Sequence, residues 1–385
     1  MSLNARMLLA LNFGSTSLKA VSYSLPTSAT SARLVAEQGG RVTVETPHES
    51  LAKLEDDAHA SLSEVARQLS EQDRKPDVVA HRIVHGGEHP GPAELTQETL
   101  AGLRSLSALA PLHQPPALAL VQAAIQRWPD ARQIGVFDTS WHQTMPDRHR
   151  VLPIPYSLYA SGVKRYGFHG LAFQSAMRQL ARIDTGLSNA RVVLAHLGGG
   201  SSLCAVRNGQ CVNTTMGMTP LGGIAMSSRS GSLDPGVLLH LQRSLAMSPE
   251  EIDRLLWRES GLKGLSGQSG DMRNLLASNS EGARRAIDVY VSGVVQGIAA
   301  MAASIGGIDA LVFSGGIGTH GSEIRKRVTD ELAWMGLEID AVLNQAGATN
   351  LSSSAAPART FVVSVEEEQE MADAVAKMES ERPRQ

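Results

Sequence analysis

Short apolar runs alternate with longer segments whose hydrophobic residues recur at helical spacing along most of the chain. The runs are rich in Val, Ile, Leu and Ala, which is typical of buried strands. Buried strands are therefore predicted at 7–11, 78–84, 133–137, 191–197, 310–314 and 360–363. Helices are predicted at 50–71, 97–109, 117–127, 249–259, 280–305, 322–335 and 366–378.

The alternation of strands and helices predicts an α/β fold. Most predicted strands end in a cluster of Gly, His, Asp or Ser, as expected where functional loops leave the carboxyl ends of strands. Two sections, LLALNFGSTSLKAVSYS and VVLAHLGGGSSLCAVRN, repeat the order of strand, Gly/Ser-rich loop and strand. The chain has 385 residues, enough for two domains of ordinary size. The repeat indicates a duplicated core whose two halves face each other across a cleft.

Composition excludes some classes of partner. The formal net charge is -3 and the pI is near 6.5, so electrostatics give no reason to expect nucleic acid or an anionic membrane surface. We find no apolar run that approaches the roughly 18 residues of a membrane span, and the N-terminus lacks the pattern of a signal peptide. We therefore expect a cytoplasmic protein without a membrane partner.

The two cysteines, Cys204 and Cys211, flank Asn208-Gly209, a sequence that predicts a two-residue hairpin turn. Pairing across that turn sets Cys204 opposite Asn213 and Cys211 opposite Val206. The two sulfurs then lie diagonally on one face. Two cysteines are too few for a disulfide framework or a four-cysteine zinc site, so we expect buried free thiols.

Two Gly- and Ser-rich loops follow predicted strands. LNFGSTSLKA, which begins at Leu11, is either an ordinary turn or a seat for phosphate oxygens made of backbone N–H groups, hydroxyls and the Lys19 ammonium. HLGGGSS, which begins at His196, is either a flexible bend or a loop whose backbone approaches a charged ligand closely. The chain has no Walker A sequence.

A third Gly-rich segment, SGGIGTHG from Ser314, favours a different class of protein. Gly316, Gly318 and Gly321 fit G-x-G-x-x-G between a predicted strand and a predicted helix. Glu338 and Asp340 follow at about the distance of the acidic ribose ligand in a dinucleotide-binding unit. A dehydrogenase is therefore one hypothesis, although the motif lies near the C-terminus without a clear second half around it.

Other polar residues favour the handling of phosphate and carboxylate. Arg82 lies within an apolar strand, where it needs an anionic partner. Arg229 lies among small residues that permit close approach of a ligand, and His169 lies between Phe168 and a glycine. Asp138 directly follows a predicted strand. Together with a late glutamate cluster, these groups suit phosphoryl transfer around Mg²⁺.

At these residues the sequence resembles the acetate kinase (acetate and butyrate kinase) family, in the superfamily of sugar kinases, heat-shock-cognate ATPases and actin. The resemblance covers nearly the whole chain. It rests on ordered blocks: NFGSTSLK, HRIVHGGE, PLHQPP, VFDTSWHQTMP, IPYSLY, KRYGFHG, HLGGGSS, TTMGMTPLGG, SRSGSLDPG, GLSGQSGDMRN, SGGIG and EEEQEMA. It implies two ribonuclease-H-like (actin-type) domains with a central cleft, residues 1–139 plus 368–385 and residues 140–367.

The resemblance also implies an activity, the reversible transfer of phosphate from ATP to the carboxylate of acetate. Acetyl phosphate and ADP are the products, transfer is direct and in line, and Mg²⁺ or Mn²⁺ is required. A homodimer is implied as well. Propionate as a second acid and another donor such as pyrophosphate remain alternatives, as does a non-catalytic nucleotide-binding protein on the same fold.

The matching blocks assign roles to individual residues. Asn12 and Glu367 would support the metal ion, and Ser17 and Lys19 would lie near the nucleotide phosphates. The nucleotide would also contact His196, Leu197, Gly198, Gly199, Gly200, Asp271, Met272, Arg273, Gly316, Ile317, Gly318, Thr319 and His320. The small apolar pocket for the methyl group of the acid would consist of Val84, Leu112, Phe168 and Pro220.

The same resemblance implies the catalytic groups. Arg82 and Arg229 would hold the carboxylate and the migrating phosphoryl group. His169 would stabilise the transition state, with His113 nearby, and Asp138 would be the essential acidic residue. Acetate is already ionised at neutral pH, so the nucleophile needs no strong general base.

Several positions depart from the usual pattern of the family. Gly199 stands where asparagine is common, and Thr319-His320 replaces Glu-Asn. Further departures are Gly222 for glutamate, Asn213 for aspartate and Ser227-Ser228 for Gly-Thr. Most of these departures lie in segments expected to bind the nucleotide or its phosphates. The identity of the phosphoryl donor is therefore less well determined by the sequence than that of the acceptor.

Overall fold

The computed structural model describes residues 6–13, 17–25, 37–45, 54–71 and 74–381. The chain separates into two compact units, unit 1 (Met1–Trp141 with Glu366–Gln385) and unit 2 (His142–Val365). Each unit has its own sheet and its own hydrophobic core. Glu367, which we expected in the second domain, lies in unit 1, because its carboxylate pairs with Arg82 of the unit 1 sheet.

The unit 1 sheet has six strands in the order β3-β2-β1-β4-β6-β5. β1, β2 and β3 are antiparallel neighbours, β1, β4 and β6 run parallel, and β5 adds an antiparallel edge. The bounds are β1 (Arg6–Phe13), β2 (Ser17–Leu25), β3 (Glu37–Glu45), β4 (Val78–Ile83), β5 (Ala93–Glu94) and β6 (Arg132–Phe137).

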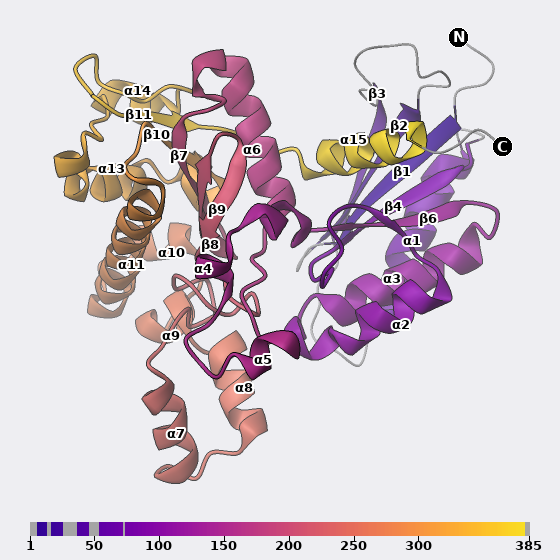
Figure 1. Cartoon of the computed structure of the whole chain (residues 1–385), viewed down its shortest axis with the longest axis horizontal. Coiled ribbons are helices and arrows are strands. Elements are labelled where there is room, and N and C mark those ends of the chain that lie inside the picture. Colours follow the sequence, from indigo (N-terminus) through magenta and orange to yellow (C-terminus); the bar gives the residue numbers. More distant parts are fainter. Residues whose placement is uncertain (1–5, 14–16, 26–36, 46–53, 72–73, 382–385) are drawn as a thin grey trace. The chain divides into compact units, whose positions relative to one another are not determined.

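Helices cover both faces of this sheet. α1 (Leu54–Ser70) and α3 (Gln114–Arg127) pack on one face and α15 (Glu367–Ser380) on the other (Figure 1). Side chains alternate along β1, so Leu9 and Leu11 join the core beneath α1 and α3. Asn12 points to the opposite face and donates to α15. The shorter helices are α2 (Gln97–Ser105), η2 (Ser107–Leu109) and η3 (Ser140–Thr144).

The unit 2 sheet has five strands in the order β11-β10-β7-β8-β9. β7, β8 and β9 are antiparallel neighbours, and β7, β10 and β11 run parallel. The bounds are β7 (Arg191–Leu197), β8 (Ser201–Arg207), β9 (Gln210–Thr214), β10 (Ala310–Ser314) and β11 (Arg359–Val362). This repeats the arrangement of β1, β2, β3, β4 and β6, which confirms the duplicated core and agrees with a ribonuclease-H-like fold for each half.

The remaining elements belong to unit 2. They are α4 (Asp147–Arg150), α5 (Ser157–Ala160), α6 (Gly170–Ile183), η4 (Thr185–Leu187), α7 (Pro235–Arg243), α8 (Pro249–Arg258), α9 (Gly261–Ser266), α10 (Met272–Leu276), α11 (Glu281–Ile305), α12 (Gly315–His320), α13 (Ser322–Glu331), η5 (Ala333–Met335) and α14 (Ala341–Ala346). The buried strands predicted at 78–84, 133–137, 191–197, 310–314 and 360–363 are confirmed within one residue at each end.

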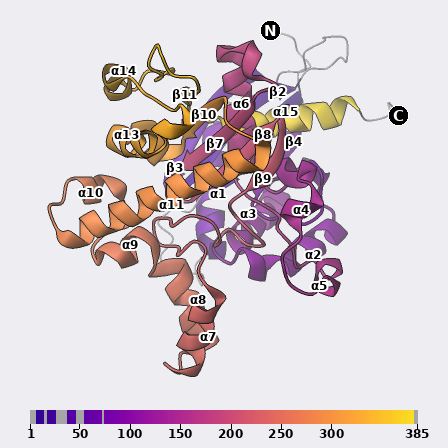
Figure 2. The ribbon, with the colours of Figure 1, turned by 60° about the vertical axis from the view of Figure 1, so that its left-hand side comes forward.

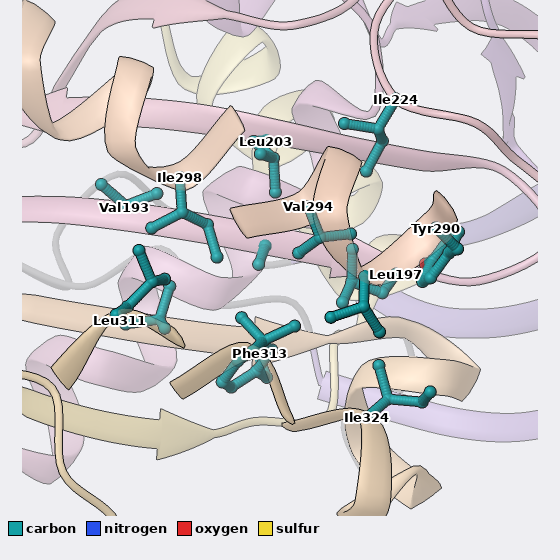
Figure 3. Close-up of a cluster of buried hydrophobic side chains, with 14 of the residues drawn as sticks. Val193, Leu197, Leu203, Ile224, Tyr290, Val294, Ile298, Leu311, Phe313 and Ile324 are labelled. Atoms are coloured by element: carbon teal, nitrogen blue, oxygen red, sulfur yellow. The ribbon is translucent and has the colours of Figure 1, made fainter. Parts of the chain in front are cut away.

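The long helix α11 packs against the unit 2 sheet, as Figure 2 shows. Val294 and Ile298 meet Leu203 of β8 and Leu311 of β10 in the core (Figure 3). Our expectation about apolar runs was wrong here, because within the described residues α11 is long and apolar enough, by length and composition, to cross a membrane. Its apolar surface is used to cover strands.

The hairpin of β8 and β9 departs from prediction in one detail. Asn208 and Gly209 both have positive φ, 53° and 71°, so they form the expected primed turn, and Val206 pairs with Cys211. Cys204, however, pairs with Thr214 and not with Asn213, because the register shifts between Ala205 and Val206. Both thiols are buried and neither forms a disulfide, as predicted.

Candidate active site

Unit 1 holds a compact cluster of charged and amide side chains around Arg82. Nη2 of Arg82 lies 2.8 Å from Asp138 Oδ2, and its Nη1 lies 2.9 Å from Glu367 Oε2. Nη1 also donates to Asn12 Oδ1 at 3.1 Å. Asn12 in turn donates from Nδ2 to Glu367 and Glu368, at 2.8 Å each.

The topology explains why these groups meet. β1, β4 and β6 are parallel neighbours, so the residues at their carboxyl ends lie along one edge of the sheet. Asn12 comes from β1, Arg82 from β4, and Asp138 directly follows β6. The first turn of α15 then supplies Glu367 and Glu368 over the same edge. The prediction that Arg82 finds an anionic partner is confirmed.

The cluster is buried and carries an excess of negative charge. Asp138 is fully buried and the Arg82 side chain is 13% exposed. Burial alone would lower the pKa of Arg82, but the Asp138 and Glu367 carboxylates raise it above its ordinary value, so the guanidinium stays charged. One guanidinium against the carboxylates of Asp138, Glu367 and Glu368 leaves a formal charge of +1 − 3 = −2.

The loop after β4 is fixed to the start of α3 by Gln114. Its Oε1 accepts from His85 N at 3.1 Å, and its Nε2 donates to His85 O at 2.9 Å. This bonding holds the stretch after β4, which begins with the buried Val84, against the segment that contains Leu112 and the half-buried His113. Phe168 and Pro220 belong to unit 2, so the complete apolar pocket stays a prediction.

The first predicted phosphate loop is described only at its two ends. Residues 14–16 lie outside the described part of the chain, as does the side chain of Ser17. Lys19 is exposed on β2 and stands directly opposite Asn12 in the register of β1 and β2. Directly opposed residues share a face of the sheet, so Lys19 lies on the face that carries Asn12 and α15.

In unit 2, His169 is held in an unusual backbone conformation at the start of α6. Its φ is 60°, in the left-handed region that residues other than glycine rarely adopt. Nδ1 of its ring lies 2.8 Å from Ser202 Oγ of β8, and its ring centroid lies 4.8 Å from that of His196. Ser202 has no local sequence signal for this contact, because it is 33 residues from the histidine that it orients.

Arg229 and His169 both lie close to Gly200, in the loop between β7 and β8. A Cβ added to Gly200 would lie 3.1 Å from His169 Nε2 and 3.8 Å from Arg229 Nη1, so both side chains face this glycine. Nη1 donates to the Pro220 carbonyl at 3.1 Å, and the guanidinium lies over the Trp257 ring. Burial lowers the pKa of Arg229 to about 10, which leaves it charged at neutral pH.

Many of the predicted nucleotide residues line one pocket of about 460 Å³ in unit 2. This volume lies in the range of small-molecule sites. The lining consists of Gly198, Gly199, Ser227, Gly270, Asp271, Met272, Arg273, Leu276, Gly316, Ile317, His320 and Gly321. A larger hollow of about 820 Å³ lies beside α9 and α11, but its described lining includes no predicted site residue. We therefore assign the smaller pocket to the site.

The comparisons with known proteins agree with this arrangement. The model of the acetokinase family matches residues 7–373. The chain belongs to the acetokinase family. An acetate kinase of Methylocella silvestris is 44% identical over 303 residues, which cover 78% of this chain and 75% of that protein. An acetate kinase of Rhodopseudomonas palustris is 39% identical over 381 residues, 94% and 96% of the two chains.

Solved structures of the acetokinase family also resemble this chain. A propionate kinase of Francisella tularensis aligns with a TM-score of 0.83 and 30% identity over 96% of this chain and 98% of that one. The acetate kinase of Porphyromonas gingivalis aligns with a TM-score of 0.79 and 29% identity over 97% and 100%. Both acids are therefore represented among the relatives.

Membership of the acetokinase family overturns the dehydrogenase hypothesis, and the structure gives the physical reason. Gly316 and Gly318 lie in α12 after β10, inside a sheet whose first three strands are antiparallel. Asp340, the candidate ribose ligand, has a different role. Its carboxylate caps α14 by accepting from Val342 N and Leu343 N. The motif is a strand-to-helix turn of a different fold.

Some residues that were predicted to bind the nucleotide form structural contacts elsewhere in unit 2. His196 bonds to Ser314 Oγ of the neighbouring strand at 3.2 Å. The carbonyls of Gly318 and Thr319 accept from Nη1 of the buried Arg325 at 2.9 and 2.8 Å. Leu197 is buried in the core, and Gly200 faces His169 and Arg229. These five residues are not among those that line the pocket.

The departures from the family pattern fit locally. A Cβ added to Gly199 would meet nothing within 4 Å, so the position has room for a side chain. Ser227 lines the pocket and its hydroxyl donates to the Gly270 carbonyl. Ser228 donates to Trp257 O at 2.9 Å, and the Asn213 amide oxygen accepts from Thr214 N at 2.9 Å. Three side chains that differ from the family pattern, Ser227, Ser228 and Asn213, therefore form hydrogen bonds within this chain.

Proposed function

We propose that this protein transfers a phosphoryl group reversibly from ATP to the carboxylate of acetate, giving acetyl phosphate and ADP. The observation that carries the proposal is the match to acetate kinases over nearly the whole chain. The Arg82 cluster and the pocket of unit 2 supply the chemistry that such a reaction needs, because phosphoryl transfer depends on positioning and on neutralising charge.

We propose that Asn12 and Glu367 support a divalent cation, Mg²⁺ or Mn²⁺. The residues fit such an ion, because carboxylate and amide oxygens are the ligands that it prefers and because the cluster carries a formal excess of negative charge. When bound, the ion would neutralise charge on the phosphates of the nucleotide. Asp138 holds Arg82 in place through two nitrogens.

The acceptor and the migrating group are both anions, so cations must bring them together. Acetate is ionised at neutral pH and needs no general base. We assign Arg82 and Arg229 to the carboxylate and the phosphoryl group, and His169, oriented by Ser202, to the charge that develops during transfer. The small residue at Gly200 lets a phosphoryl group approach both His169 and Arg229.

For the donor, the pocket of about 460 Å³ favours a nucleoside. Asp271, Met272 and Arg273 at the start of α10, together with Gly316, Ile317 and His320, would contact the adenosine. Pyrophosphate needs no such pocket. ATP is therefore the preferred donor in this proposal, and GTP, other nucleoside triphosphates and pyrophosphate are the competitors in the test.

Hydroxylamine trapping of the acyl phosphate tests the proposal directly. Purified protein with acetate, Mg²⁺ and ATP should form acyl hydroxamate, and omission of acetate or chelation of the metal should stop it. Turnover would exclude a non-catalytic nucleotide-binding protein, whereas binding of ATP without any hydroxamate would contradict the proposal. Running the assay with GTP and pyrophosphate ranks the donors.

The preferred acid follows from the same assay with propionate. We propose acetate, because the pocket residues match those that the family resemblance assigns to a methyl group. One methylene changes binding in an apolar pocket by only about 1 to 3 kcal/mol, so propionate is the second candidate acid. A kcat/KM for propionate above that for acetate would reassign the substrate. The Francisella tularensis relative, a propionate kinase, makes this comparison necessary.

We also propose a cytoplasmic homodimer. Several large apolar side chains of unit 2 are exposed and available for a second copy, among them Leu233, Val237, Leu239, Leu245 and Val289. Light scattering should give twice the mass of 40.9 kDa. A monomer at micromolar concentration would contradict this part of the proposal.

A further inference from the structure

Three side chains with metal-binding atoms meet inside unit 2, apart from the groups assigned to phosphoryl transfer. They are His142, Cys204 and Cys211. Sγ of Cys211 lies 3.1 Å from His142 Nδ1 and 3.5 Å from Cys204 Sγ. The three atoms all lie within 4.8 Å of one another, and each residue is at most 1% exposed. Both cysteines of the chain are therefore in this cluster.

The fold brings the cluster together from distant parts of the sequence. The shift of register between Ala205 and Val206 sets Cys204 opposite Thr214, on the hairpin that also carries Cys211. The 3-10 turn η3 supplies His142, and its Thr144 donates to the Cys211 carbonyl at 2.9 Å. A side chain on Gly167 would collide with the His142 ring, since an added Cβ would lie 2.6 Å from it.

The hydrogen bonds of His142 prepare its ring for a metal ion. Nε2 lies 2.9 Å from the carbonyl oxygen of Phe168, which can only accept, so Nε2 carries the proton. Nδ1 then presents a lone pair toward the two sulfurs. Metal-binding histidines usually donate their other N–H to a carbonyl or carboxylate in this way, which fixes the tautomer and the ring orientation.

We propose that His142 Nδ1, Cys204 Sγ and Cys211 Sγ bind one soft monovalent metal ion, Cu(I). Thiolates select Cu(I) and Zn²⁺ among the common ions, and structural Zn²⁺ takes four ligands. No fourth His, Cys or carboxylate joins the three within the described residues. Ligand atoms about 2.3 Å from one ion in a trigonal arrangement lie about 4 Å apart, so small side-chain movements are sufficient.

Binding balances in charge and protons. Two thiols release two protons as two Cu–S bonds form, and the site then carries a charge of −1. The Arg150 guanidinium acts on Cys211 and partly offsets this charge. Because both thiols must lose a proton before they bind the ion, copper affinity should increase with pH.

The test is an anaerobic titration of the reduced, metal-free protein with Cu(I) against a chromogenic Cu(I) chelator. We expect one copper ion per chain, retained against the chelator, and at least tenfold weaker binding in both C204A and C211A. His142→Asn should weaken binding as well, whereas His149→Asn serves as the control on a histidine outside the cluster. Circular dichroism of every variant establishes that it is folded.

Two results would overturn the proposal. One is transfer of all copper to the chelator, or equal retention by the folded C204A variant. The other is tighter binding of Zn²⁺ than of Cu(I) in a parallel titration, which would mean that a fourth ligand is present. X-ray absorption of the loaded protein should show two sulfur neighbours and one nitrogen. None of these readouts depends on turnover, so they stand apart from the test of the kinase activity.

Discussion

Replacement of Arg82 by alanine tests the assigned role of the unit 1 cluster. The guanidinium bonds to Asp138, Glu367 and Asn12 and is mostly buried, with 13% of the side chain exposed. An arginine that acts on a phosphoryl transition state contributes about 10³ or more in rate, which corresponds to about 4 kcal/mol. Loss of one partner from a buried ion pair also costs about 3–5 kcal/mol of stability.

The control for this variant is Arg132→Ala. Arg132 begins β6, with Asp138 just beyond the other end of that strand, about 20 Å away at the rise of a β-strand. It is similarly buried, at 17% exposure, and also pairs with two carboxylates, Glu94 and Glu379. Both variants should lower the midpoint of urea unfolding, but only Arg82→Ala should lower hydroxamate formation about 10³-fold. Activity of Arg82→Ala within tenfold of the unaltered protein would refute its assigned role.

Three further predictions concern single contacts. Ser202→Ala removes the hydrogen bond to His169 Nδ1 and should lower kcat about 10- to 100-fold and shift the pH profile, with KM for ATP unchanged. An unaltered kcat and profile would exclude Ser202 as a positioning residue. Gly316→Val places a side chain in open space of the nucleotide pocket and should raise KM for ATP at least tenfold without changing KM for acetate or the thermal midpoint. Burial alone would raise the pKa of Glu379, but the neighbouring Arg6 and Arg132 lower this pKa below its ordinary value. The Glu379 carboxylate therefore stabilises the fold above its unfolded pKa, and this stabilisation is lost as the pH falls through the folded pKa. Glu379→Gln should therefore flatten acid unfolding measured by circular dichroism, and an unchanged acid midpoint would contradict this.

Sequence patterns predicted the elements that carry the site better than the contacts within it. Apolar runs placed Arg82 within one predicted strand and Asp138 directly after another, and burial required an anion beside Arg82. That these two strands are parallel neighbours is known only from the structure. The segments that contain Asp271 and Gly316 are 45 residues apart in sequence, yet the family resemblance assigned both to one nucleotide, and the structure sets both on one pocket.

The contacts that sequence reasoning missed depend on side chains from distant segments. Arg325 has the appearance of a charge on an exposed helix, but it is 1% exposed and bonds to Asn344 and to the carbonyl at the end of α12. The shift of register at Ala205 has no signal in the local sequence. Because of this shift, Cys204 pairs with Thr214 and not with Asn213. His142 and Cys211 are 69 residues apart, so their contact follows only from the fold.

The proposed function requires that the guanidiniums of Arg82 and Arg229, one in each unit of the chain, act on the same migrating phosphoryl group. A double-mutant cycle of Arg82→Ala and Arg229→Ala, measured as kcat/KM for acetate with saturating MgATP, tests it most directly. Groups that act as a unit in one transition state are strongly non-additive, so the double variant should lose at least tenfold less than the product of the two single losses, a coupling of about 1.4 kcal/mol. Losses that multiply within about twofold would mean that the two arginines act independently, which would contradict the account.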